Sequence, residues 1–293
     1  MDQVSMEWKG ASYAKINLGL HVLAKLPNGF HLIETGLVYI NWSDQFVIKP
    51  ANQTRLEFSD LSIPTDETNL VSKALFLLRG LGLKGDYHID VRKDIPAGAG
   101  LGGGSSNAAF TLKAFNKIEN LGISDDLLAE LAAKLGSDVP FFLKNEAVIA
   151  SGTGTKMESK PIQPNYWIVT AFPKEHSSTA EAYQYCEPDH EKQPLANLLK
   201  QDPEEDWPFV LFNDLEPAVI PRIHAVGNFK DAMIEAGAFY TAMTGSGSAV
   251  FGLFEQEFVA SEAFTSLLQL GYPASLTKPA FVPDQKIYIR ESE

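Results

Sequence analysis

Residues 96–109 read Pro-Ala-Gly-Ala-Gly-Leu-Gly-Gly-Gly-Ser-Ser-Asn-Ala-Ala, and five glycines fall between Gly98 and Gly104. Glycine at this density destabilises helices and strands alike, because it loses more conformational freedom on folding than any other residue. A loop with so many glycines therefore needs unusual backbone angles or the close approach of another molecule.

The sequence on either side of this loop indicates what it binds. Residues 87–92 alternate as a strand does, and residues 105–118 are typical of a helix. A glycine loop between a strand and a helix presents free backbone N–H groups and the positive end of the helix dipole to an anion. A phosphate fits this arrangement better than other common ligands. The alternative is a tight turn without a ligand, but such a turn needs only one or two glycines.

Two known phosphate loops can be compared with this stretch. A P-loop ends in Gly-Lys-Ser or Gly-Lys-Thr, and neither triplet occurs in the chain. Gly98–Gly103 matches the dinucleotide pattern G-x-G-x-x-G, and Glu119 lies near the distance at which an acid would bind a ribose. Glu119, however, falls within or at the end of the predicted helix, and not at the tip of a following strand. The match alone is weak evidence for a nicotinamide oxidoreductase.

Composition limits the class of protein. The 293 residues suffice for one large or two ordinary domains, and 45% of them are apolar. The net charge of −13 disfavours nucleic-acid binding, which depends on positive charge. The single cysteine, Cys186, excludes an internal disulfide and fits a cytoplasmic protein. The chain has no apolar run near about 18 residues, and its first residues lack a basic or apolar leader, so we expect no membrane segment or secretion signal.

The N-terminal region contains two long predicted strands. Residues 12–22 alternate cleanly, which places Lys15 and Asn17 side by side on the polar face. That face is either solvated or part of a site. Pro27-Asn28-Gly29 predicts a turn, and a strand from 30 to 40 follows it. Phe30 and His31 therefore lie just beyond a hairpin tip, where they either hold a flat ring or pack under the turn.

Asp138 and a second glycine loop are further candidates. Asp138 lies between a predicted helix end and Pro140, so we expect its side chain to be partly buried and fixed, for a ligand or only for nearby backbone N–H groups. The second loop, residues 244–248, joins two predicted strands and is either a tight hairpin or a functional element. The other expected strands are 46–49, 56–58, 147–151, 167–172, 239–243, 249–254 and 286–289. The other expected helices are 69–81, 125–135 after Ser124, one that carries Tyr183 after residues 177–179, segments within 213–236, and 257–270, with 186–208 as a surface excursion.

Three of these motifs together resemble the GHMP kinases over nearly the whole chain. They are residues 14–20 (Ala-Lys-Ile-Asn-Leu-Gly-Leu), 96–109 and 244–249 (Thr-Gly-Ser-Gly-Ser-Ala). The resemblance implies a two-domain α+β fold with the active site between the domains. Residues 1–160 would form an ATP-binding domain like ribosomal protein S5 domain 2, and residues 161–293 a ferredoxin-like C-terminal domain.

The resemblance also implies roles for individual residues. Asp138 would accept the proton of the substrate hydroxyl, and Lys15 would favour the charged form of Asp138 and stabilise negative charge. Mg²⁺ would accompany ATP, with Ser106 as a candidate ligand. The implied ATP-binding residues are Asn69, Lys93, Pro96, Ala97, Gly98, Ala99, Gly100, Leu101, Gly102, Gly103, Gly104, Ser105 and Ser106. The implied substrate-binding residues are Asn17, Phe30, His31, Thr179, Tyr183, Gly245, Ser246 and Gly247.

Within the family, the motifs resemble the kinases that act on a cytidine diphosphate-linked polyol. These motifs are residues 15–17, 27–31, 136–141 and 213–216. The family often has tyrosine where this chain has Phe30, so stacking on a base survives here but a phenolic hydrogen bond does not. The expected partner is a small molecule, without nucleic acid, membrane or an obligate protein partner.

Three alternatives remain. The nearest is a GHMP kinase for homoserine, mevalonate or a sugar, and the hairpin with Tyr183 argues against it because those substrates present no base to stack. A nicotinamide oxidoreductase would need the glycine loop in an N-terminal βαβ unit, whereas here it follows about four strands and a helix. An RNA-binding module like ribosomal protein S5 would need a basic face, which the net charge of −13 disfavours.

Overall fold

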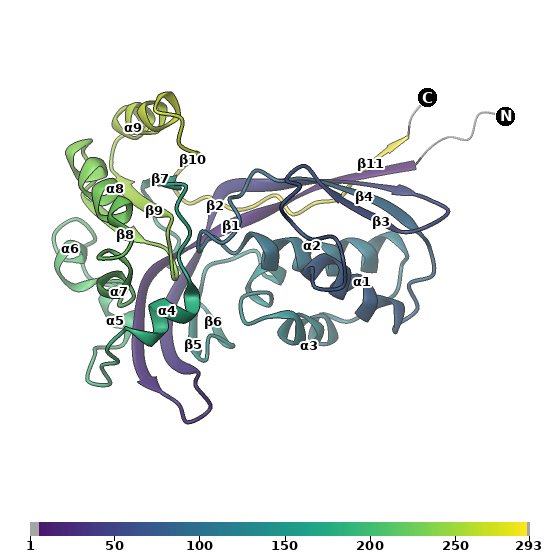
Figure 1. Cartoon of the computed structure of the whole chain (residues 1–293), viewed down its shortest axis with the longest axis horizontal. Helices are drawn as coiled ribbons and strands as arrows, with labels where there is room; N and C mark the ends of the chain where they lie inside the picture. Colours follow the sequence, from purple (N-terminus) through teal and green to yellow (C-terminus); the bar gives the residue numbers. More distant parts are fainter. Residues whose placement is uncertain (1–5, 292–293) are drawn as a thin grey trace.

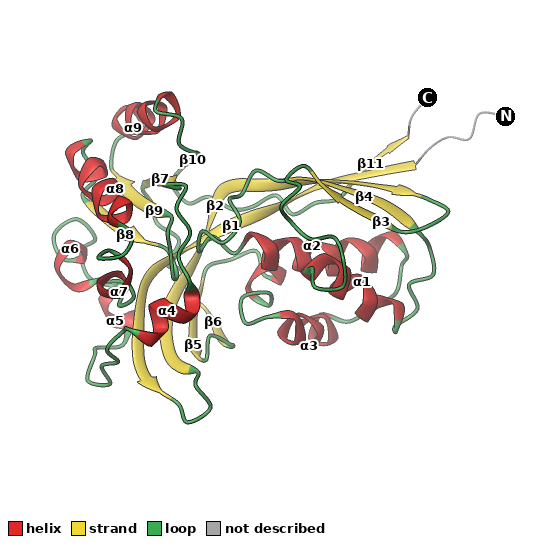
Figure 2. Ribbon diagram, in the orientation of Figure 1, coloured by secondary structure: helices red, strands yellow, loops and turns green. Residues whose placement is uncertain are grey.

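The computed structural model describes residues 6–291, and its helices and strands form the expected α+β architecture with two sheets (Figures 1 and 2). Residues 1–5, part of the N-terminus expected to lack a leader, lie outside the described residues. Within the described range, no helix combines the length and apolar character needed to cross a membrane.

The larger sheet is built on two long antiparallel strands, β1 (Met6–Lys25) and β2 (His31–Pro50). The sequence predicts a break in the second strand after residue 40, but β2 is continuous. The reason is Asp44, which resembles a turn residue yet is buried inside the strand pattern. Its carboxylate accepts hydrogen bonds from the backbone N–H groups of Asp94 and Ile95, and from the Asn107 amide.

The other strands of this sheet lie along β1 and β2 in the order β11-β1-β2-β4-β3, and β5 and β6 extend it beside another part of β2. Their bounds are β3 Arg55–Phe58, β4 Tyr87–Arg92, β5 Val148–Gly152, β6 Lys156–Ser159 and β11 Tyr288–Glu291. The sequence expects the last strand within the second half of the chain, but β11 pairs with β1, with Lys9 opposite Tyr288. The end of the chain therefore returns to the first sheet. The sequence also missed β6.

Three helices cover one face of the larger sheet: α1 (Leu70–Arg79), α2 (Gly103–Ile118) and α3 (Asp125–Leu135) (Figure 1). Their apolar faces and the inner face of the sheet share one core, in which Phe46 and Phe110 pack ring to ring. Ser124 caps α3 as predicted, since its side chain accepts a hydrogen bond from the Leu127 N–H. Helix α2 begins two residues before its predicted start, inside the glycine loop itself.

The smaller sheet has the antiparallel order β10-β7-β9-β8. Its strands are β7 Trp167–Ala171, β8 Tyr240–Met243, β9 Val250–Phe254 and β10 Ala274–Thr277, and its helices are α8 His224–Glu235 and α9 Glu257–Gln269. In chain order these elements give the β-α-β-β-α-β arrangement of a ferredoxin-like unit. The expected C-terminal fold is therefore present, although β10 was missed and supplies the fourth strand.

Short helices connect the smaller sheet to the hairpin of β1 and β2: α4 Thr179–Gln184, α5 Leu195–Leu198, α6 Trp207–Val210 and α7 Glu216–Val219, while the 3-10 turn η1 spans Phe141–Leu143. The sequence expects residues 186–208 to be a surface excursion, but Leu195 and Trp207 are buried against β1 and the smaller sheet. Backbone hydrogen bonds from Leu20 to Phe212 and from Asp214 to Leu20 add to this contact. The two sheets are thus joined through the hairpin end of β1.

Candidate active site

Two cavities meet at the glycine loop of residues 98–105. The larger, of about 1100 Å³, lies between the β1–β2 hairpin, the loop, α4 and the second glycine loop. The smaller, of about 480 Å³, lies between the loop and the start of α1. Gly98, Gly100, Gly102 and Ser105 line both cavities. One ligand group held at this loop can therefore be reached from two binding spaces.

The backbone of the loop is left-handed at every second residue. The φ angles of Gly98, Gly100 and Gly102 are +63°, +80° and +72°, a region that side chains rarely adopt. The loop also touches the second glycine loop: a Cβ atom at Gly100 would lie 2.1 Å from the Thr244 carbonyl oxygen. The Ala249 N–H donates to the Ala99 carbonyl at 3.1 Å. The two glycine loops thus fix each other's position.

We expect Gly100→Ala to lower the free energy of unfolding by about 2–4 kcal/mol, because it adds a left-handed φ cost to a backbone overlap. The measurement is urea unfolding followed by circular dichroism. Gly122→Ala is the matched control, since Gly122 has φ +68° and nothing within 4 Å of its Cβ position. It should lose only about 1–2 kcal/mol. Equal losses in both variants would mean that contact between the loops does not constrain position 100.

The start of α2 offers backbone donors without a side-chain cap. Gly102 is the N-cap residue and makes no capping hydrogen bond, so the first N–H groups of the helix have no partner within it. The two serines that follow differ. Ser106 is buried and its hydroxyl donates to the Tyr13 carbonyl at 2.7 Å, whereas Ser105 lines both cavities. The Ser105 side chain therefore faces the cavities, whereas that of Ser106, the metal ligand predicted from the sequence, faces Tyr13.

Lys15 lies at the wall of the larger cavity on β1. Its ammonium donates to Asn17 Oδ1 and to the Gly100 carbonyl, both at 2.6 Å, and lies 3.8 Å from Asp138 Oδ2. Burial lowers the pKa of Lys15, and the Asp138 carboxylate opposes part of that shift. The predicted pair of Lys15 and Asp138 is thus present, and it lies beside the glycine loop.

Asp138 is held by its backbone and is open on its side-chain face. It lies in the turn after α3, where its carbonyl accepts from the Phe141 N–H at 3.2 Å. The side chain of Lys15 is 4% exposed and that of Asp138 is 39% exposed. Among the described residues, no hydrogen bond reaches the Asp138 carboxylate, and no other acid lines the larger cavity. The alternative that the Asp138 carboxylate only accepts hydrogen bonds from nearby backbone N–H groups is therefore wrong.

Asn17 holds Lys15 in place. Its Oδ1 accepts from Lys15 and from Thr244 Oγ1, and its Nδ2 donates to Thr35 Oγ1 at 2.9 Å. The Asn17 side chain is therefore largely occupied by protein partners, although it lines the cavity. Sequence reasoning missed Thr35 and Thr244 as its anchors, because no local pattern shows that residues so far apart in the chain meet.

The hairpin tip brings aromatic rings to the other end of the larger cavity. His31 and Tyr183 stack directly, with ring centroids 5.0 Å apart and planes at 29°. Direct contact at this spacing leaves no room for a base between the two rings. Phe30 is 64% exposed and lines the same cavity. A base can therefore stack only on a ring face that this pair leaves open, with Phe30 as the free ring at the hairpin.

Electrostatics at the hairpin favour a neutral imidazole. Burial and the nearby Lys25 ammonium lower the pKa of His31. Burial, followed by the Asp138 carboxylate, raises the pKa of Tyr183 to about 12. Lys25, at the end of β1, pairs with His31 across the hairpin and also lines the cavity. Sequence reasoning missed Lys25, although the strand register across the Pro27-Asn28-Gly29 turn would have placed it there.

The remaining candidates fall on the two sides of the glycine loop. Thr179, at the start of α4, lies 2.7 Å from Ser246 through their hydroxyl oxygens, and Gly245 lines the cavity beside them. Gly247 packs on Met243 instead.

Asn69 and Lys93 line the smaller cavity, but both side chains have protein partners. Asn69 caps α1, accepting from the Val71 N–H at 2.8 Å. The Lys93 ammonium lies 2.5 Å from Asp44 Oδ2 and donates to the Ile95 carbonyl at 2.9 Å.

Known proteins resemble this chain over most of its length. Residues 69–146 match the family described as GHMP kinases N terminal domain, and residues 195–273 match GHMP kinases C terminal. The 4-diphosphocytidyl-2-C-methyl-D-erythritol kinase of Prosthecochloris aestuarii is 39% identical over 92% of this chain and 96% of its own. That of Cytophaga hutchinsonii is 39% identical over 87% and 96%.

Solved structures give the same result. A 4-(cytidine 5'-diphospho)-2C-methyl-D-erythritol kinase superposes with a TM-score of 0.78 and 30% identity, over 92% of this chain and 98% of that one. A homoserine kinase from Cytophaga hutchinsonii superposes with a TM-score of 0.65 over 99% of this chain and 98% of its own. At 16% identity, that second likeness supports the fold alone.

Proposed function

The chain belongs to the GHMP kinases, and on that premise we propose that it is a 4-diphosphocytidyl-2-C-methyl-D-erythritol kinase. It would transfer the terminal phosphoryl group of ATP to the 2-hydroxyl of that substrate, a step of the methylerythritol phosphate route to isoprenoid precursors. The observation that carries the proposal is the Lys15–Asp138 pair beside a glycine loop that lines two cavities.

The two cavities suggest how the substrates divide. Kinases of this family use ATP, and we place its base and ribose in the smaller cavity, with its phosphates on the glycine loop at the start of α2. The polyol would lie in the larger cavity, so that its hydroxyl meets the phosphates where the loop lines both. We propose residues 1–160 as the ATP-binding domain and 161–293 as the C-terminal domain, except that β11 returns to the first sheet.

Asp138 would receive the proton of the attacking hydroxyl. Its carboxylate is open to the larger cavity, and the Lys15 ammonium lies 3.8 Å away. Lys15 would stabilise the negative charge that gathers during transfer, because a buried cation acts strongly where water is excluded. Phosphoryl transfer depends mainly on such positioning and electrostatics.

A divalent cation fits this site only in part. The Ser105 hydroxyl lines both cavities, while no carboxylate among the described residues lines the smaller one. Mg²⁺ binds phosphate oxygens readily and keeps several waters. We therefore propose Ser105, in place of Ser106, as the protein ligand of a Mg²⁺ ion that neutralises phosphate charge when bound. We also propose a cytoplasmic location, on the single cysteine of the sequence.

The test of this function is ADP release from Mg-ATP with four acceptors in parallel: 4-diphosphocytidyl-2-C-methyl-D-erythritol, homoserine, mevalonate and galactose. We expect turnover with the cytidine compound alone. Turnover with another acceptor would still support a kinase that uses the Lys15–Asp138 pair, but it would contradict the proposal that the hairpin binds a base. ADP release with none of the four would reject the proposed activity.

We expect His31→Ala to raise KM for the cytidine substrate by about 10–100-fold, because it removes a ring worth about 1–3 kcal/mol of support to a stacked base. The KM for ATP should stay within about twofold, since His31 lines only the larger cavity. His190→Ala is the control, because His190 is exposed and lines neither cavity. An equal rise in the KM values for ATP and for the cytidine substrate would show that His31 does not recognise the base.

A further inference from the structure

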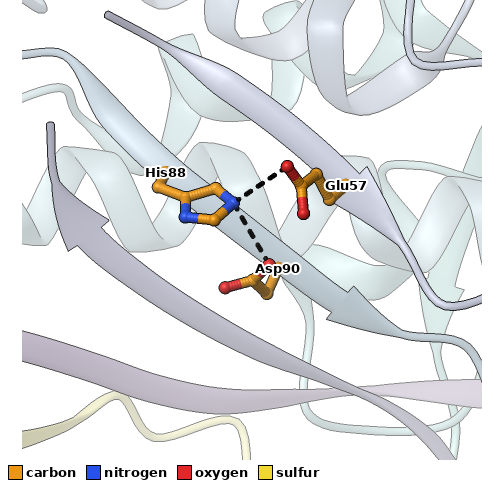
Figure 3. A group of neighbouring side chains, drawn as sticks. All are labelled: Glu57, His88 and Asp90. Carbon is orange, nitrogen blue, oxygen red and sulfur yellow. Dashed lines mark ion pairs between the residues drawn. The ribbon is translucent and has the colours of Figure 1, made fainter. Parts of the chain in front are cut away.

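Three side chains that the kinase reaction does not use converge on the outer face of the larger sheet (Figure 3). They are Glu57 on β3 and His88 and Asp90 on β4. In the parallel pairing of these strands, Glu57 lies opposite Asp90, and His88 is two residues before Asp90 on the same face. None of the three lines either cavity of the proposed active site.

The imidazole nitrogen at the centre of this group has no hydrogen-bond partner. His88 Nε2 lies 3.3 Å from Asp90 Oδ1 and 3.4 Å from Glu57 Oε1, but it is shut off from solvent and aligned with neither oxygen for a hydrogen bond. The imidazole as a whole is 35% exposed, so its other side can meet water. Two carboxylates around a buried nitrogen that makes no hydrogen bond are favourable only with a positive charge among them, which a bound cation would supply.

The spacing of the three atoms fits a small divalent cation. One oxygen or nitrogen from each residue lies within 4.8 Å of the others. Two ligand atoms that are each about 2.0–2.1 Å from a tetrahedral zinc ion lie about 3.3–3.4 Å apart. Both separations from His88 Nε2, 3.3 Å to Asp90 and 3.4 Å to Glu57, have this value. One imidazole, two carboxylates and a water would complete a four-coordinate site.

The basic side chains near Glu57 and Asp90 do not neutralise these two carboxylates. Among the described residues, Glu57 and Asp90 have no ionic partner other than His88. The cations Lys49 on β2 and Arg92 on β4 have other partners, since Lys49 pairs with Glu7 at 3.1 Å and Arg92 with Asp94 at 2.9 Å. Arg55, opposite His88, takes part in none of the ion pairs that the described residues form. It is therefore the side chain of this protein that could compete with a metal ion for the two carboxylates.

We propose that Glu57, His88 and Asp90 form a structural site for one Zn²⁺ ion that fastens β3 to β4. Strand β3 has only four residues and lies at the edge of the sheet, so it has neighbours on one side alone. It leads into Ser62, Ile63 and Pro64, which line the smaller cavity. The ion would thus order the edge of the sheet next to that cavity.

The test is zinc titration of the metal-free full chain, without nucleotide, by isothermal calorimetry. We expect one equivalent that is lost, or weakened more than about 100-fold, in His88→Ala and in Glu57→Gln with Asp90→Asn, because even outer partners of metal ligands are worth about 10–100-fold. Glu130→Gln is the matched control, since Glu130 is an exposed carboxylate of α3 outside this group, and it should keep that equivalent. Unchanged melting in EDTA would show that each variant folds.

Hydrogen exchange gives a second, local measurement. Zinc should slow exchange of the amides of residues 55–58 in the wild-type chain and in Glu130→Gln, but not in His88→Ala. A zinc titration that is the same for wild type and His88→Ala overturns the proposal and leaves Glu57, His88 and Asp90 as a cluster without a metal. So does unchanged exchange of residues 55–58 on adding zinc.

Discussion

Asp138→Asn should lower kcat by about 10²–10⁴-fold, the range for loss of a well-placed general base. The amide keeps the shape of the side chain but cannot take the proton of the substrate hydroxyl. The prediction rests on the open position of this carboxylate: it lines the larger cavity, accepts no hydrogen bond among the described residues, and faces the Lys15 ammonium at 3.8 Å. The measurement is steady-state ADP release at saturating concentrations of both substrates.

Two further measurements separate catalysis from binding and folding. The Kd for ATP, measured without added magnesium, should change less than about threefold, because Asp138 does not line the smaller cavity. Glu130→Gln is the control, since it makes the same change at an exposed position of α3. It should leave kcat as in wild type. Near-normal turnover of Asp138→Asn would remove Asp138 from the chemistry and leave Lys15 and the glycine loop as the catalytic groups.

The sequence predicted those elements of the fold that follow from local residue patterns. Period-two alternation predicted β1 and β4, and the glycine loop predicted the start of α2 to within two residues. The pattern failed where a polar residue is buried for a distant reason. Asp44 interrupts the apolar alternation, yet its hydrogen bonds to residues 94, 95 and 107 keep β2 continuous. A local stretch of sequence does not show hydrogen-bond partners that lie 50 or more residues away.

The strands β10 and β11 show a second limit. Both are short, and their place is decided by which sheet edge is free. Strand β10 completes the smaller sheet beside β7, and β11 returns to β1. The sequence suggested one final strand in the second half, because chain order is the only guide to pairing when no long periodic run is present.

The candidate site was predictable as a set of residues but not as a set of contacts. The resemblance to the GHMP kinases implied that Lys15, the glycine loop and Asp138 lie close together, and the structure brings them together. The sequence could not show that Ser106 turns away to Tyr13, or that His31 stacks on Tyr183 itself. Side-chain direction at the first turn of a helix and ring contact across a hairpin depend on packing between distant elements.

The largest remaining effect is expected for Lys15→Met. It should lower kcat by about 10²–10³-fold, the usual cost of removing one donor that stabilises transition-state charge. Methionine has a similar length but no charge, so the cavity wall keeps its shape. The KM values should change less than kcat, because the Lys15 side chain is 4% exposed and its ammonium is bound by Asn17 and Gly100. Lys134→Met, at the exposed end of α3, is the control.

The titration of Lys15 predicts a pH dependence of the wild-type protein, for which Lys15→Met is the reference. Burial holds the folded-state pKa of Lys15 below 10.5, while the unfolded chain keeps about that value. Between the two pKa values the unfolded state binds more protons, so this lysine makes stability rise as pH increases through that window. Activity should fall over the same window, because the ammonium loses its charge. The free energy of unfolding of wild type relative to Lys15→Met should therefore increase with pH while the kcat ratio decreases. Curves that stay parallel up to pH 10.5 would show that Lys15 is not the titrating group.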